Sequence, residues 1–172
     1  RFGNHPFIPT VASDPTKTAA DVSLFNGIKH LVSFDSNASD GNPEGTATLA
    51  QISKTRFNLT YNLTNEDAFG GSISSFDDFG TLAKESVSLS GQTLILGVRD
   101  AGLPTGVIVQ LEDTSGKKDQ VRLSAVTGTE KFYSIAASLF DDVDLTHITA
   151  IVILLEEDRL VDKTSTLHVR FG

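Results

Sequence analysis

The sequence predicts an all-β fold, a two-sheet antiparallel β-sandwich of the jelly-roll type. From residue 28 onward, apolar and polar residues alternate with a period of two, as in strands with one buried face. Turn residues separate the alternating segments, and no window of helical length has a sustained apolar stripe at i, i+3 and i+4. About nine or ten short strands at this spacing are typical of two packed sheets.

The first 20 residues are predicted to form an extended arm or linker, followed by the sandwich domain over residues 21–172. The arm contains three of the five prolines and has little periodicity. It is either a flexible tail or an ordered strand that pairs with a neighbouring module. The second alternative is favoured because four apolar side chains of the arm need cover: Phe2, Phe7, Ile8 and Val11.

The first half of the domain contains the clearest strand. Weak alternation predicts two strands before it, at 28–34 and 47–52. In the third, residues 56–64, one face is apolar and the other polar: Phe57, Leu59, Tyr61 and Leu63 against Asn58, Thr60, Asn62 and Thr64. This is the pattern of a half-buried strand with a solvated outer face. A glycine-rich loop at 69–71 and a short helical turn at 75–82 are expected to follow.

The second half contains two near-continuous apolar runs, 93–98 and 148–155, which predict central strands covered on both faces. Turn residues at 102–106 and 113–118 separate alternating segments. The remaining predicted elements are strands at 86–89, 106–112, 120–125, 131–135 and 166–171, and a short helical turn at 138–143.

Composition excludes several classes of function. The net charge is −8 and no cluster of Lys and Arg offsets it in the sequence, which argues against nucleic acid and anionic membranes as partners. Cysteine is absent, so disulfides, thiolate catalysis and Cys-type metal sites are excluded. The longest apolar run, 148–155, is too short to cross a bilayer. An acidic surface attracts divalent cations, although it more often only keeps a protein soluble.

Several segments occur in a recognisable order: FNLTYNLT, FGG, VSLSGQTLILGVRD, VIVQLEDTSGKK and DLTHITAIVILL. In this order, over roughly residues 28–172, the chain resembles the jelly-roll carbohydrate-binding modules found beside glycoside hydrolases, which have a galactose-binding-like β-sandwich. The resemblance implies an extracellular module that holds sugar rings on Trp or Tyr platforms. This chain has no Trp and two Tyr. Tyr61 shares a face with core residues, so Tyr133 is the candidate ligand-binding residue.

No catalytic motif is present. The four histidines are scattered, and the sequence contains neither HExxH nor Gly-x-Ser-x-Gly. Adjacent carboxylates such as Asp77 and Asp78 do not supply the two opposed carboxylates that a glycosidase needs. We therefore expect that the chain is not an enzyme.

Two clusters of oxygen ligands are candidates for Ca²⁺. The first comprises Asp35, Asn37 and Asp40, which resembles the start of an EF-hand loop, except that the glycine comes one position late and no Glu stands at the twelfth position. The second comprises Asp141, Asp142 and Asp144. The resemblance to jelly-roll modules implies a structural Ca²⁺ without locating it. Solvated turns are the alternative, because Asp, Asn and Ser are ordinary turn residues.

Three glycosylation sequons begin at Asn37, Asn58 and Asn62. Asn58 and Asn62 lie on the polar face of one predicted strand, where an attached glycan has room. A polar ladder of Thr and Asn facing solvent is the alternative.

The chain begins with Arg1-Phe2-Gly3 and finishes with Arg170-Phe171-Gly172. This repetition is natural in a tandem array, in which residues 1–20 join one unit to the next or complete its sheet. We therefore predict a secreted or cell-surface structural or adhesive unit of a surface or fibre-like assembly, whose partners are copies of itself or neighbouring repeats. The alternative is a module that binds polysaccharide and is attached to a larger secreted enzyme.

Overall fold

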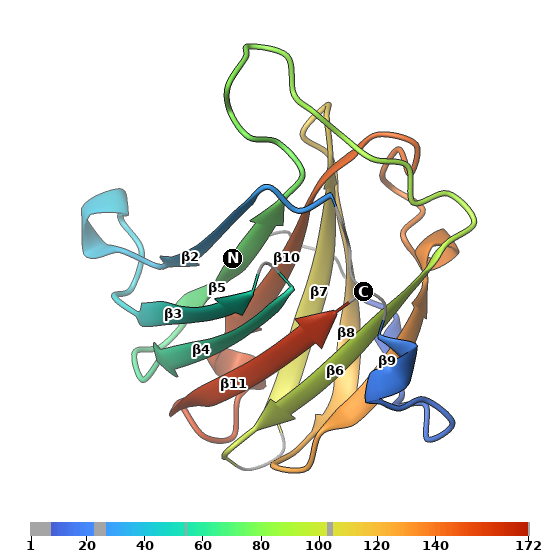
Figure 1. The fold of residues 1–172 in the computed structure, drawn as a ribbon. Helices are drawn as coiled ribbons and strands as arrows, with labels where there is room; N and C mark the ends of the chain where they lie inside the picture. Colours follow the sequence, from blue (N-terminus) through green and yellow to red (C-terminus); the bar gives the residue numbers. More distant parts are fainter. Residues whose placement is uncertain (1–7, 23–26, 54, 103–104, 172) are drawn as a thin grey trace.

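Two β-sheets face each other across an apolar core in the computed structural model, which describes residues 8–22, 27–53, 55–102 and 105–171 (Figure 1). The six-stranded sheet has the order β1 (Thr10–Val11), β8 (Lys118–Val126), β7 (Thr105–Asp113), β10 (Ile148–Glu156), β5 (Phe69–Ser75) and β2 (His30–Asp35). The five-stranded sheet has the order β3 (Thr46–Ser53), β4 (Arg56–Asn62), β11 (Thr164–Phe171), β6 (Thr93–Asp100) and β9 (Lys131–Ala136).

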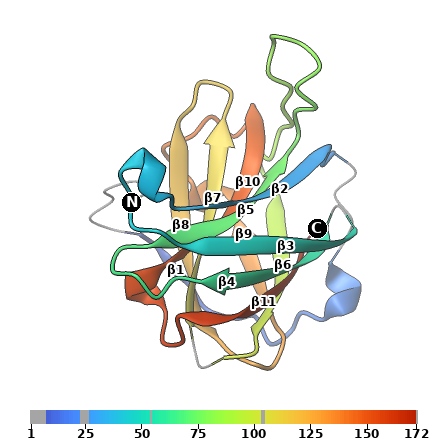
Figure 2. The same ribbon diagram turned by 90° about the vertical axis from the view of Figure 1, so that its left-hand side faces the viewer.

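The predicted antiparallel jelly-roll sandwich is confirmed. Every strand pair is antiparallel except β1 and β8, and the two layers are seen from the side in Figure 2. The helices of the described chain are single 3₁₀ turns: η1 (Ala19–Asp21), η2 (Ala38–Asp40), η3 (Ala137–Leu139) and η4 (Glu157–Arg159). Within those residues, no helix has the length and apolar character needed to span a membrane.

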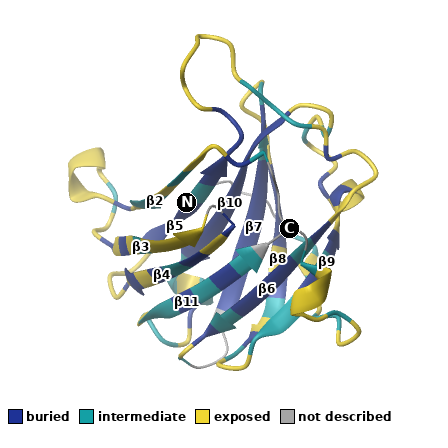
Figure 3. Cartoon of the chain, in the orientation of Figure 1, coloured by how far each residue is buried: buried dark blue, intermediate teal, exposed yellow. Residues whose placement is uncertain are grey.

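The alternation in the sequence places one face of each sheet in the core. In β4, Phe57, Leu59 and Tyr61 are buried between the sheets, whereas the polar residues between them face outward (Figure 3). Fully burying a large apolar side chain contributes about 1.5–3 kcal/mol to folding. The core therefore determines which face of each strand is left for ligands.

Strand β10 is buried on both of its faces, as its continuous apolar run predicts. Ile151 and Ile153 pack in the main core, whereas Val152 and Leu154 lie on the opposite side of the sheet. There they form a second, smaller cluster with Phe69, Ile108, Ile8, Phe34 and Ile73. The centre of the outer face of the six-stranded sheet is therefore apolar and covered.

Residues 69–71, predicted as a loop, are instead the start of β5, which pairs with β10 and β2. Gly71 lies opposite Leu154 and Phe34. A Cβ atom on Gly71 would lie 1.9 Å from the carbonyl oxygen of Ile153, so no side chain fits there. The glycines of this segment permit close approach of strands rather than a turn.

Residues 75–82 were predicted as a helical turn, but Ser75 ends β5 and residues 76–82 form an irregular segment that leads into the loop projecting beyond the sheets (Figure 1). The Asp77 and Asp78 carboxylates accept hydrogen bonds from the backbone N–H groups of Phe79 and Gly80, at 2.9 and 2.8 Å. Such local bonds compete with helix formation. After this loop, the strand predicted at 86–89 is reduced to one bridge between Val87 and Ile148.

The described part of the N-terminal segment joins the edges of the two sheets. Strand β1 pairs in parallel with β8. The N–H of Asp14 then donates to the carbonyl of Phe132 in β9 (2.7 Å), and Ser134 Oγ donates to Asp14 Oδ2 (3.0 Å). Residues 1–7 and 172 lie outside the described residues, and with them Phe2, Phe7, the whole of Arg1-Phe2-Gly3 and the last residue of Arg170-Phe171-Gly172. The domain boundary at residue 20 stays a prediction.

Candidate functional site

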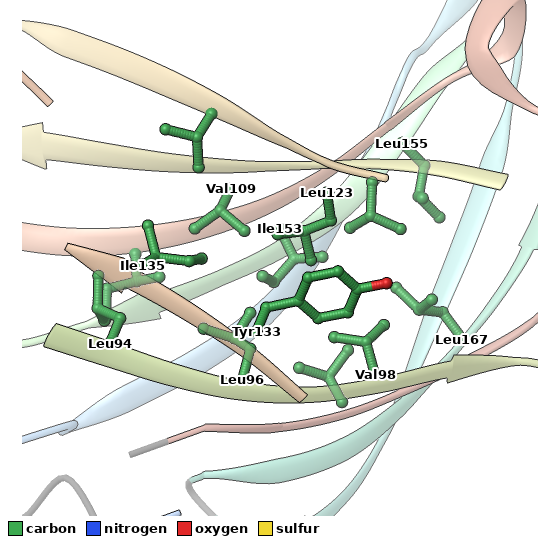
Figure 4. Close-up of a cluster of buried hydrophobic side chains, with 14 of the residues drawn as sticks. Leu94, Leu96, Val98, Val109, Leu123, Tyr133, Ile135, Ile153, Leu155 and Leu167 are labelled. Carbon is green, nitrogen blue, oxygen red and sulfur yellow. The ribbon is translucent and has the colours of Figure 1, made fainter. Parts of the chain in front are cut away.

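Tyr133, the predicted ligand-binding residue, belongs to the core (Figure 4). Its hydroxyl donates to the carbonyl of Ser124 (2.8 Å), and burial raises the pKa of Tyr133 to about 12. In the register of β9 and β6, Tyr133 lies opposite Leu96, whereas Phe132 lies opposite Gly97. Because successive strand residues point to opposite faces, Phe132 is the aromatic residue that faces outward.

The outer face of the five-stranded sheet contains a pocket of about 40 Å³, which we call the arginine pocket. Cross-strand register brings its residues together: Asn58 in β4 lies opposite His168 in β11, which lies opposite Arg99 in β6. In the next row, Arg170 lies opposite Arg56. The pocket is lined by Arg56, Asn58, Arg99, Glu130, His168, Val169 and Arg170.

Hydrogen bonds orient two side chains of the arginine pocket. Glu130 Oε2 accepts from Arg170 Nε at 2.9 Å. His168 Nδ1 lies 2.6 Å from Asn58 Oδ1 and donates to it, which leaves Nε2 of the imidazole as an acceptor. Within the described chain, the guanidinium groups of Arg56 and Arg99 have neither a hydrogen bond nor an ion pair. They are free to bind a ligand.

A larger pocket of about 360 Å³, which we call the edge pocket, lies between the N-terminal segment and β9. It shares Glu130 with the arginine pocket, so the two pockets adjoin. Phe132 is half-buried and supplies an aromatic wall, and Asp14 and Lys17 supply charged groups. The edge pocket is lined by Ser13, Asp14, Pro15, Lys17, Thr18, Glu130, Lys131 and Phe132.

The residues of the first predicted Ca²⁺ cluster bind the backbone of their own loops. Asp35 Oδ2 accepts from the N–H of Ala47 (3.0 Å). Asn37 Oδ1 accepts from the N–H of Ser39 (2.9 Å) and caps η2, which contains the exposed Asp40. This is the turn chemistry that was the alternative interpretation.

The second predicted cluster is divided. Asp141 and Asp142 lie with Asp119 of β8, and carboxylate oxygens of the three residues are all within 4.8 Å of one another. Asp144 instead accepts from Thr146 Oγ1 at 2.6 Å, and this bond and one from His147 hold the pKa of Asp144 at about 2. Asp119 was not predicted, because it stands in a strand far from the other two in sequence.

A third acidic group comprises Asp77, Asp78 and Glu85, and the side chain of Lys29 already supplies its counter-charge. The Lys29 ammonium lies 2.5 Å from Glu85 Oε1, and this hydrogen bond raises the pKa of Lys29. Glu85 Oε2 accepts from the N–H of Asp78 (3.1 Å). Asp119 also accepts from backbone N–H groups, those of Gln120 (2.8 Å) and Asp142 (3.1 Å), but no described Lys or Arg pairs with its group. This group is therefore the better candidate for Ca²⁺.

We expect Ca²⁺ to stabilise the protein through Asp119, Asp141 and Asp142. At a concentration about tenfold above the dissociation constant, binding to the folded state alone contributes about 1.4 kcal/mol. For a chain of this size, the melting temperature would then rise by roughly 3–6 °C. Thermal denaturation with and without about 10 mM CaCl₂ measures this, since weak extracellular sites bind near about 1 mM.

The variant Asp141→Asn/Asp142→Asn should lose the rise in melting temperature, and Asp40→Asn should keep it. Loss of the rise in Asp40→Asn instead would place the ion in the first predicted cluster. No difference between CaCl₂ and NaCl of equal ionic strength would contradict a structural Ca²⁺.

The three sequon asparagines differ in accessibility. Asn37 and Asn62 are exposed, and Asn62 Oδ1 accepts from Thr64 Oγ1 (3.0 Å). Asn58 is half-buried and bonded to His168 in the arginine pocket. Glycosylation at all three stays a prediction, and a glycan on Asn58 would cover the pocket.

Comparison with solved structures shows the fold. No protein-family model matches the sequence, and no curated protein matches it. A family 11 carbohydrate-binding module of a cellulosomal cellulase of Clostridium thermocellum matches at 14% identity and TM-score 0.50, over 85% of this chain and 87% of that chain. A family 30 carbohydrate-binding module matches at 12% identity and TM-score 0.52, over 84% and 92%. An agarase matches at 11% identity and TM-score 0.51, over 88% of this chain and 26% of that chain. At these identities, the likeness shows a jelly roll like that of carbohydrate-binding modules.

Proposed function

We propose that this chain is a non-catalytic module that binds a glycan on the outer face of its five-stranded sheet. The observation that carries the proposal is the pair of adjoining pockets on that face. The edge pocket has the volume of a small-ligand site, about 360 Å³. The C–H groups of a sugar ring pack on an aromatic face such as Phe132, and sugar hydroxyls need the donors and acceptors that surround it.

The fold and the N-terminal segment support this proposal over the structural or adhesive role. The solved structures that match include carbohydrate-binding modules, one of them from a cellulase. They support attachment of this chain to a secreted enzyme and a secreted or cell-surface location. Strand exchange with a neighbouring copy would use the N-terminal arm. Residues 10–14 of that arm are hydrogen-bonded to β8 and β9 of the same chain. Self-association is therefore the second candidate.

The variant Phe132→Ala should weaken glycan binding about tenfold, because loss of one aromatic contact costs about 1.4 kcal/mol. Isothermal titration calorimetry would be run with neutral cello- and agaro-oligosaccharides and with acidic oligosaccharides. Phe79→Ala is the matched control, since Phe79 is 65% exposed in the projecting loop, away from both pockets.

Equal affinities of Phe132→Ala and the unsubstituted protein would exclude the edge pocket as the binding site. If no oligosaccharide binds, and light scattering shows assembly that depends on protein concentration, the structural or adhesive role takes the place of glycan binding.

A further inference from the structure

The arginine pocket concentrates positive charge on an acidic protein. The chain has six arginines and a net charge of −8, yet three of the six line this one pocket. Glu130 is the only carboxylate among the described lining residues, and it is already paired with Arg170. Among the described residues, the guanidinium groups of Arg56 and Arg99 are left without a counter-charge.

The sheet register makes this arrangement unfavourable in the absence of a ligand. Arg56 and Arg170 lie directly opposite each other on β4 and β11, and like charges in such cross-strand pairs are destabilising. His168 lies between Asn58 and Arg99 in the adjacent row. An anion in the pocket would offset this repulsion.

The electrostatics at His168 report the same excess of positive charge. Burial and the nearby charges of Arg99 and Arg56 lower the pKa of His168, against the opposing effects of Asp100 and Glu130. The imidazole is therefore neutral at neutral pH, and its charge would return if a bound anion compensated the arginines.

We propose that the arginine pocket binds the carboxylate or sulfate group of an acidic glycan. This inference rests on the proposed function of glycan binding. The volume of about 40 Å³ admits a group of a few heavy atoms. The planar guanidinium groups of Arg56 and Arg99 match the oxygens of either anion. The sugar ring that carries the anion would extend toward Glu130 and the edge pocket, which places the ring near Phe132.

Three probes separate the sources of the anion: oligogalacturonate, a sulfated galactan oligosaccharide, and the same galactan without sulfate. Calorimetry should show that at least one acidic probe binds about tenfold more tightly than the neutral galactan. This preference should shrink as NaCl rises from about 0.05 M to about 0.5 M, because salt screens exposed charges.

The variant Arg99→Gln should lower the affinity for the acidic probe about tenfold and leave that for the neutral galactan within about twofold. Arg122→Gln, at an exposed arginine of β8 in the other sheet, is the matched control and should change neither. As an independent measurement, NMR titration should show that the acidic probe raises the pKa of His168 and that the neutral probe does not.

Binding of neutral probes with the same or higher affinity than acidic ones would overturn this inference and leave the proposed function intact. Equal losses in Arg99→Gln and Arg122→Gln would also overturn it, because the effect would then be one of net charge. If none of these probes binds but a cello-oligosaccharide does, only the inference fails; if no oligosaccharide of either set binds, both the inference and the proposed function fail.

Discussion

Replacing Gly71 with alanine is expected to destabilise the protein by about 3–5 kcal/mol, among the largest effects of a single substitution. The added Cβ would lie 1.9 Å from the backbone carbonyl oxygen of Ile153, and 3.0 Å from the ring of Phe34. A backbone atom cannot rotate away, so β5 must move from β10 and break the hydrogen bonds in the middle of the six-stranded sheet.

Thermal or urea denaturation of Gly71→Ala would measure this effect, with a fall in the melting temperature of roughly 10 °C or more. Gly128→Ala is the matched control, because its Cβ would meet only the carbonyl oxygen of Asp100 at 3.5 Å, an ordinary contact. The control should change the free energy of unfolding by less than about 0.5 kcal/mol. Similar stabilities of the two variants would show that β5 does not pack against β10 as described.

The second large effect is expected for Asp100→Ala, at about 3–4 kcal/mol of lost stability. Asp100 is fully buried and accepts hydrogen bonds from Tyr61 Oη (2.7 Å), Ser165 Oγ (2.5 Å) and the N–H of Gly102 (2.9 Å). Removing the carboxylate leaves these donors without an acceptor, and each buried unsatisfied donor costs about 1–3 kcal/mol.

A double-mutant cycle with Tyr61→Phe isolates one of these bonds. In the Tyr61→Phe background, Asp100→Ala should cost about 1–2 kcal/mol less, because the hydroxyl that would otherwise be buried without an acceptor has already been removed. The free energies of unfolding of the four proteins can be compared by urea denaturation. Additive effects would mean that Tyr61 and Asp100 do not interact in solution.

Sequence pattern predicted the fold wherever burial alone decides it. Strand β4 has one buried and one solvated face, and β10 is buried on both, so their side-chain patterns are unambiguous. Strand β5 was missed because Gly70 and Gly71 are depleted in ordinary strands. They are needed here because neighbouring strands approach closely, a tertiary requirement that local sequence does not contain.

The proposed binding face was harder to predict than the fold. Phe132 and Tyr133 are adjacent in sequence, and only the pairing with β6 decides which one faces outward. Arg56 and Arg170 each occupy an outward position of a predicted strand, whereas Arg99 directly follows the strand predicted at 93–98, so the sequence contained only part of the signal. Their convergence depends on β11 lying between β4 and β6, and strand order is not encoded in the alternation.

The position of β11 also has a consequence for the order in which the protein can be assembled during synthesis. The last of the described strands, β11, is central to its sheet, with β4 and β3 on one side and β6 and β9 on the other. These two pairs cannot be joined by hydrogen bonds until residues 164–171 have emerged from the ribosome. Contacts between residues so distant in sequence form slowly. Until then the two strand pairs of this sheet remain separate, and the proposed binding face forms only when β11 inserts between them.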